Sequence, residues 1–145
     1  ATWLDNITSD HGPLVDLYEL AKEHYFHPRM GGSLSIKYVL PAVWFESEKI
    51  RNHPWFSQYV REKDGRLLEP YEALDPLPFG DDAIEDEGEA VREGTGAIRT
   101  YQEMMYGLRK SDAAFRNTYK QLLLNYCKLD TAAMVMIWMH WTAGR

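Results

Sequence analysis

The chain has 145 residues, of which 45% are hydrophobic and 26% charged, and these values fit one soluble globular domain with a substantial core. Its net charge of −6 argues against a generally basic surface of the kind that binds nucleic acid. However, residues 81–89, DDAIEDEGE, hold six acids and no base, so the remainder is close to balanced. A locally basic surface or a carboxylate metal site therefore stays open.

The cysteine content and the apolar segments bear on the compartment. One cysteine, Cys127, excludes an internal disulfide framework and fits a reducing compartment, so we expect a cytoplasmic location. The C-terminal run AAMVMIWMHW is too short to span a bilayer and is interrupted by His140. We therefore expect no membrane partner.

The first part of the chain predicts one helix. Residues 1–12 lack clear periodicity and predict an opening strand or a loop. Residues 13–25 carry apolar side chains at helical spacing, with Pro13 suited to the first helical turn because its missing N–H is not needed there. Pro28 and two glycines then end the helix.

Shorter helices are predicted next. The apolar positions that follow favour a short helix over a strand, with Ser33 as its N-cap and Pro41 at its end. Residues 46–63 predict two short helical pieces that meet at Pro54. Residues 64–88 are rich in proline, glycine and acids, so they predict an acidic loop.

Two longer helices complete the chain. A stripe of apolar residues over 88–108 predicts a helix, and Ser111 or Asp112 can cap a final helix of about 112–142. No segment has a strong strand pattern. The chain is therefore expected to be mainly α, and residues 1–145 to form a single, incomplete domain.

The final helix carries one acid, Asp130, on its apolar face, one turn after Tyr126. An ionised carboxylate buried there needs a cation, hydrogen bonds or solvent, because an unpartnered charge is costly to bury. One explanation is structural: Asp130 pairs with an Arg or Lys, or caps another helix. The other is a Mg²⁺ or Mn²⁺ site, in which Tyr126 orients the attacking water.

A family resemblance bears on this choice. YCKLDTAAMVMI resembles the third motif of the DEDD-type 3′-5′ exonucleases of the tyrosine subclass, in which Tyr, three residues and Asp lie on the last helix of an RNase H-like fold. Residues 16–43, 88–105 and 122–138 also resemble, in the same order, the bacterial family called domain of unknown function 2779, itself predicted to be exonuclease-like. Together these segments cover more than a third of the chain.

The resemblance implies a fold and a set of site residues. The chain would be the helical C-terminal half of an RNase H-like α/β exonuclease fold. Asp130 would be a catalytic, metal-binding carboxylate and Tyr126 the water-orienting residue, with Mg²⁺ or Mn²⁺ as cofactor. Lys37, Ser33 and Ser35 would face the phosphate backbone of the substrate. The alternative for Lys37 is a solvated surface lysine.

The resemblance also fails in places. The family's opening Asp-x-Glu strand and its second acidic motif are missing, and Asp86-Glu87 lies in the acidic loop instead. Asp16 lies where such folds often have an Asp after a strand, and we interpret it as a helix-starting or structural residue in preference to a catalytic one. We therefore expect a C-terminal fragment of a nuclease that acts on DNA or RNA, supplies one of four carboxylates and is inactive by itself. Its partners would be nucleic acid and the missing N-terminal part.

A second hypothesis is a non-catalytic helical module that binds a protein partner. Its contact surfaces would be the apolar MVMIWMHW end and the acidic loop. Five aromatic residues in the middle of the chain also leave two possibilities open, since they could stack on single-stranded bases or pack a core. They are Trp44, Phe45, Trp55, Phe56 and Tyr59.

Overall fold

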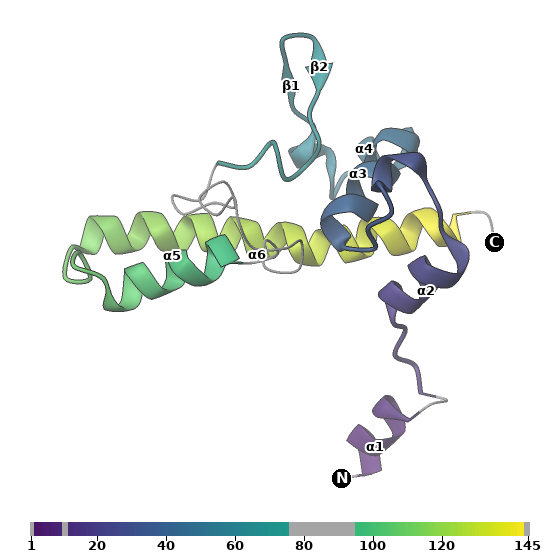
Figure 1. The fold of residues 1–145 in the computed structure, drawn as a ribbon, viewed down its shortest axis with the longest axis horizontal. Coiled ribbons are helices and arrows are strands. Elements are labelled where there is room, and N and C mark those ends of the chain that lie inside the picture. The colour runs from purple at the N-terminus through teal and green to yellow at the C-terminus, as the bar shows by residue number, and fades with distance from the viewer. Residues whose placement is uncertain (1, 10–11, 76–94, 144–145) are drawn as a thin grey trace.

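The structure, a computed structural model, describes residues 2–9, 12–75 and 95–143 (Figure 1). Helices dominate these residues, and the only strands among them are two of two residues each. The prediction of a mainly helical chain is thus confirmed. The expected glycine- and proline-rich loop of 64–88 lies outside the described residues from position 76 onward.

The core forms where α3 (Ile36–Glu46) packs against the second half of α6 (Ala113–Thr142). Both helices bury large apolar side chains completely, and α3 is apolar almost all round, as expected for a helix that is covered on several sides. The fully buried side chains at this contact include Leu40, Val43 and Trp44 of α3 and Leu129 and Met136 of α6.

The N-terminal region differs from the prediction. The opening residues form a helix, α1 (Thr2–Thr8), and not a strand or loop. The next helix, α2 (Leu17–His24), begins four residues after Pro13, which lies outside it. Asp16 is the reason, because its carboxylate accepts hydrogen bonds from the N–H groups two and three residues later and thereby starts the helix. The helix-starting role expected for Asp16 is confirmed.

The start and the end of α3 correct two expectations. Ser35, and not Ser33, is the N-cap, because the Ser35 hydroxyl accepts the N–H of Lys37 at 3.4 Å. Pro41 lies inside the helix and does not end it. The proline removes one N–H donor, but the buried apolar residues on both sides of it hold the helix in the core.

After α3 the chain forms short elements, as predicted around Pro54. These are α4 (Glu48–Arg51) and the 3₁₀ turn η2 (Ser57–Tyr59). Another 3₁₀ turn, η1 (Pro28–Met30), lies before α3. The antiparallel hairpin of β1 (Glu62–Lys63) and β2 (Arg66–Leu67) follows. No strand was predicted there, since each strand is too short to show an alternating pattern.

The aromatic group of the middle segment packs mainly in the core. Trp44, Phe56 and Tyr59 are buried, and Trp44 Nε1 donates a hydrogen bond of 3.0 Å to the carbonyl of Leu68. This bond joins α3 to the segment that follows the hairpin. Trp55 alone of the group is largely exposed, so base stacking by the group as a set is not supported.

α5 (Thr95–Tyr106) and the first half of α6 form an arm beside the core. α5 packs along the first half of α6, and the two extend away from α3 and α4 (Figure 1). Asp112 caps α6 by accepting the N–H of Phe115 at 3.0 Å, as one of the two predicted caps. We call residues 95–129 the α5–α6 arm.

The length of α6 bears on the expectation of no membrane partner. By length and composition alone, this helix of 30 residues is long and apolar enough to cross a membrane. The core helix of a soluble protein can meet the same two criteria. The second half of α6 packs against α3 in the core. The absence of a membrane partner stays a prediction.

Candidate functional site

Asp130 is half-buried on α6 and has a hydrogen-bond donor that neither explanation anticipated. The hydroxyl of Tyr71, from the segment after the hairpin, donates to Asp130 Oδ1 at 2.7 Å. Burial raises the pKa of the Tyr71 hydroxyl above its ordinary value of 10.0, and the adjacent Asp130 carboxylate raises it further. The phenol therefore stays protonated and remains a donor at physiological pH.

Tyr126 and Lys37 lie at the same place. The Tyr126 ring is 6.0 Å from the Tyr71 ring, measured between centroids, and the Lys37 ammonium lies 5.7 Å from the centroid of Tyr126. The second distance is within the range of a cation–π contact. The structure thus brings together Lys37, Tyr126 and Asp130, three of the five residues singled out from the sequence.

A second carboxylate, Glu69, belongs to this group. Its Oε1 accepts the backbone N–H of Glu72 at 3.2 Å, whereas its Oε2 is buried and has no hydrogen-bond partner among the described residues. Burial raises the pKa of the Glu69 carboxyl, and backbone N–H groups and the charge of Lys37 oppose that rise. We call Lys37, Glu69, Tyr71, Tyr126 and Asp130 the Asp130 cluster.

The two predicted serines are used in a different way. Ser35 Oγ caps α3, and Ser33 Oγ accepts the N–H of Ser35 at 3.3 Å. Both hydroxyls therefore organise the backbone that precedes Lys37. Their contact with a phosphate backbone stays a prediction.

The described residues do not complete a divalent metal site. Among them, no group of three or more His, Cys, Asp or Glu side chains lies close enough together to hold a metal ion. The Asp130 cluster has two carboxylates, and one oxygen of Asp130 already accepts a hydrogen bond. A Mg²⁺ or Mn²⁺ ion prefers several oxygen ligands, so these residues could furnish only part of its coordination sphere.

Tyr71 and Glu69 were missed in the sequence. Both lie in the proline-containing stretch that was read as a loop, where no periodicity points to a buried side chain. The only local signal is the sequence EPY at 69–71, in which a proline separates an acid from an aromatic residue, and this proline is fully buried in the structure. Contacts between residues 59 positions apart cannot be read from spacing.

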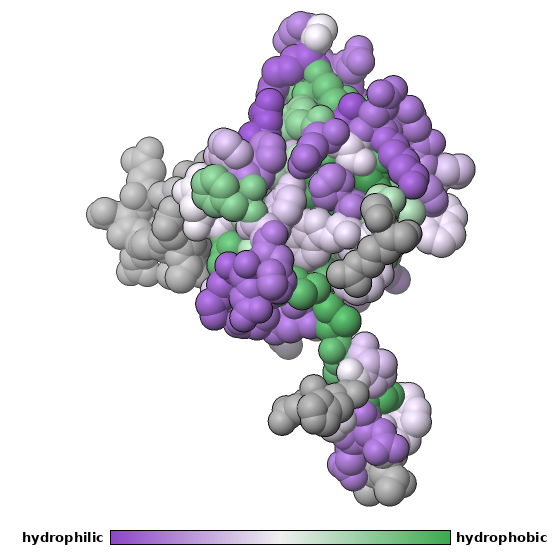
Figure 2. Space-filling view, turned by 90° about the vertical axis from the view of Figure 1, so that its right-hand side faces the viewer, coloured by the Kyte–Doolittle hydropathy of each residue, from purple (hydrophilic) through white to green (hydrophobic). Residues whose placement is uncertain are grey.

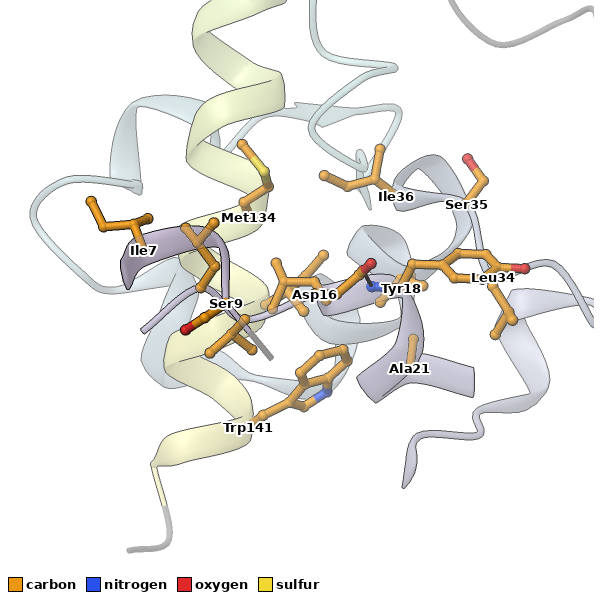
Figure 3. A pocket seen from close by; sticks show the side chains of 15 residues that line it. Ile7, Ser9, Asp16, Tyr18, Ala21, Leu34, Ser35, Ile36, Met134 and Trp141 are labelled. Carbon is orange, nitrogen blue, oxygen red and sulfur yellow. Dashed lines mark hydrogen bonds between the residues drawn. The ribbon is translucent and has the colours of Figure 1, made fainter. Parts of the chain in front are cut away.

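An apolar groove of about 990 Å³, lined by none of the residues of the Asp130 cluster, lies beside α3 and α6. Its walls come from α1, from α2 and the segment before it, from the start of α3 and from α6, with Met134 and Trp141 projecting from α6 (Figure 3). Figure 2 shows apolar surface where the segment between α1 and α2 meets the rest of the molecule, whereas most of the surface around it in this view is polar. Leu14 and Val15 of this segment are exposed.

Comparison with known proteins finds no match: no family model, no curated protein and no solved structure is similar to this chain. The functional reading therefore depends on the residues and their geometry.

Proposed function

We propose that this chain supplies the helical C-terminal half, and the carboxylate of Asp130, to a metal-dependent 3′-5′ exonuclease of RNase H-like fold. The remaining carboxylates would come from polypeptide additional to these 145 residues. Hydrolysis of DNA or RNA would then need that additional part and Mg²⁺ or Mn²⁺.

The observation that carries the proposal is the convergence of Lys37, Tyr126 and Asp130. They come from α3 and from α6, and the family resemblance implies a role in nucleic-acid hydrolysis for each. Asp130 would hold part of a metal ion's coordination sphere, Tyr126 would position water by its hydroxyl, and Lys37 would bind a phosphate. Glu69 adds a second carboxylate at the same place.

The test is hydrolysis of labelled single-stranded DNA and RNA by the complete gene product with Mg²⁺ or Mn²⁺. A catalytic metal supplies several kcal/mol of transition-state stabilisation, so Asp130→Asn is expected to lower the rate on the order of 100-fold or more. Asp64→Asn removes an exposed carboxylate from the hairpin turn and should leave the rate unchanged. Unchanged hydrolysis by Asp130→Asn would exclude Asp130 from catalysis.

The apolar groove favours a second candidate function, a non-catalytic module that binds a protein partner. Three side chains of α6 outside the core face, Met134, Val135 and Trp138, are exposed, and Met134 lines the groove. A photo-crosslinking residue at Met134 should then capture a protein of one defined mass in cells, and the same residue at exposed Lys49 should not. Equal capture at both positions would show that the groove selects no partner.

A further inference from the structure

The charges of this acidic chain are separated between its two parts. Residues 95–129, the α5–α6 arm, carry six basic and two acidic side chains, a net charge of +4 in a chain of net charge −6. A charge asymmetry of this size within one chain is typical of proteins that bind polyanions. The basic residues of the arm are Arg99, Arg109, Lys110, Arg116, Lys120 and Lys128, and its acids are Glu103 and Asp112.

The charge of the arm is available on its surface. α6 has no acid from its first residue to Leu129, so the exposed Lys120 faces no carboxylate on its own helix. The acid one turn before the exposed Arg116 is the N-cap Asp112, which pairs with Arg109 instead. Lys110, at the turn between the two helices, is also exposed. Within the described parts of the chain, none of Lys110, Arg116 and Lys120 forms an ion pair.

Other basic residues of the arm are partly engaged. Arg109 pairs with Asp112 at 2.8 Å and lies over the Phe115 ring, so its charge is largely matched locally. Lys128 donates to the neutral amide oxygen of Gln58 at 3.0 Å and keeps its charge. Unmatched positive charge therefore lies toward the outer end of the arm, at Lys110, Arg116 and Lys120, with a further charge at Lys128 near the core.

We propose that the outer end of the α5–α6 arm binds the phosphate backbone of a nucleic acid through Lys110, Arg116 and Lys120. The residues that directly follow the last two cations, Asn117 and Gln121, are exposed polar side chains that can donate hydrogen bonds to phosphate or sugar oxygens. A helix that binds an anionic membrane surface instead carries an apolar stripe, and among the large apolar side chains of α6 before Leu129, Leu124 alone is exposed. Ion pairs with phosphates release counterions, and this release drives the binding.

The position of this surface fits a strand that continues from the Asp130 cluster. With a rise of about 1.5 Å per residue, Arg116 and Lys120 lie about 15 to 21 Å from Asp130 along α6. About four to six stacked nucleotides span that distance. The inference goes beyond the proposed hydrolysis, because binding at the arm requires neither Asp130 nor a metal ion.

The experiment is fluorescence anisotropy of a labelled 20-nucleotide single strand with the 145-residue chain in EDTA. The variant combines Lys110→Gln, Arg116→Gln and Lys120→Gln. Each lost phosphate contact lowers the slope of log affinity against log salt by about 0.7, so the slope should fall by about 2 and the affinity by about 100-fold at 0.1 M salt. Asp130→Asn should bind as the unchanged chain does, which separates this result from the fate of the nuclease proposal.

The matched control neutralises two lysines and one arginine outside the arm, Lys49, Lys63 and Arg61, which are also exposed. It should retain most of the affinity. Three results would overturn the proposal. The first is that the unchanged chain does not bind the oligonucleotide at 50 mM salt. The second is an equal loss of affinity in both triple variants. The third is an arm variant that no longer binds phosphatidylserine vesicles but keeps its affinity for the oligonucleotide.

Discussion

The hydroxyl of Tyr71 donates a hydrogen bond of 2.7 Å to Oδ1 of Asp130, across 59 positions of the sequence. This bond joins the segment after the hairpin to the middle of α6 and provides a partner for the acid on the apolar helix face. The same bond fixes the direction of the Asp130 carboxylate. A carboxylate that is oriented in this way is suited to hold a ligand with its other oxygen.

Tyr71→Phe should therefore destabilise the chain by roughly 1–2 kcal/mol, because a half-buried carboxylate loses its donor and solvent replaces that donor only in part. Urea denaturation followed by circular dichroism would measure the change. Tyr38→Phe is the control, since Tyr38 is 43% exposed and its hydroxyl has no partner among the described residues. A loss of equal size in both variants would contradict a stabilising role for the bond.

The example of Asp130 shows how far sequence reasoning reaches. The helix, its apolar face and the need for a partner all follow from residues three and four apart on α6. The partner does not follow from them, because it comes from Tyr71 in a segment without periodicity. The structural explanation expected an Arg, a Lys or a helix end, and the structure provides a neutral phenol.

Glu69 should make stability depend on pH. Its pKa is raised in the folded chain, so the folded state holds this proton more tightly than the unfolded state, whose carboxyl titrates near 4.5. The stabilisation of the folded state by this bound proton is fully present below pH 4.5 and is lost as the pH rises through the raised pKa of Glu69. Glu69→Gln removes this titration. The free energy of unfolding of this variant, compared with that of the unchanged chain at the same pH, should therefore become larger as the pH rises from 4.5 to 8.

Thermal unfolding at pH values across this range would test the effect of Glu69. The control is Glu62→Gln, which neutralises an exposed carboxylate of β1. Its unfolding temperature should follow that of the unchanged chain at every pH. Parallel curves for Glu69→Gln and the unchanged chain would show that Glu69 does not titrate in this range.

Trp44→Phe tests the link between α3 and the segment that carries Glu69 and Tyr71 of the Asp130 cluster. The substitution keeps an aromatic ring but leaves the carbonyl of Leu68 without its donor, which costs about 1–3 kcal/mol in a buried position. Trp55→Phe, at a side chain that is 67% exposed, should change stability by less than about 0.5 kcal/mol. Guanidinium denaturation of both variants would measure the difference, and similar midpoints would contradict the link.

The boundaries of the helices show a different limit of sequence reasoning. The end of α6 and its Asp112 cap could be predicted, because cap and periodicity agree there. Pro41 was misread as a terminator, since the rule considers the lost hydrogen bond alone and not the burial of α3 on several sides. Tertiary packing decides whether a helix continues through a proline, and for α3 that packing depends on α6, which is distant in the sequence.

The last prediction concerns that partner helix. Leu129 of α6 is fully buried against α3, whereas Leu124, five residues earlier on the same helix, is 52% exposed. Leu129→Ala should cost about 2–5 kcal/mol, because it removes a packed side chain and leaves a cavity. Leu124→Ala should cost less than about 0.5 kcal/mol, since alanine favours the helix and little apolar contact is lost. Urea unfolding in the absence of lipid or detergent would compare the two, and equal losses would mean that the second half of α6 does not form the core with α3.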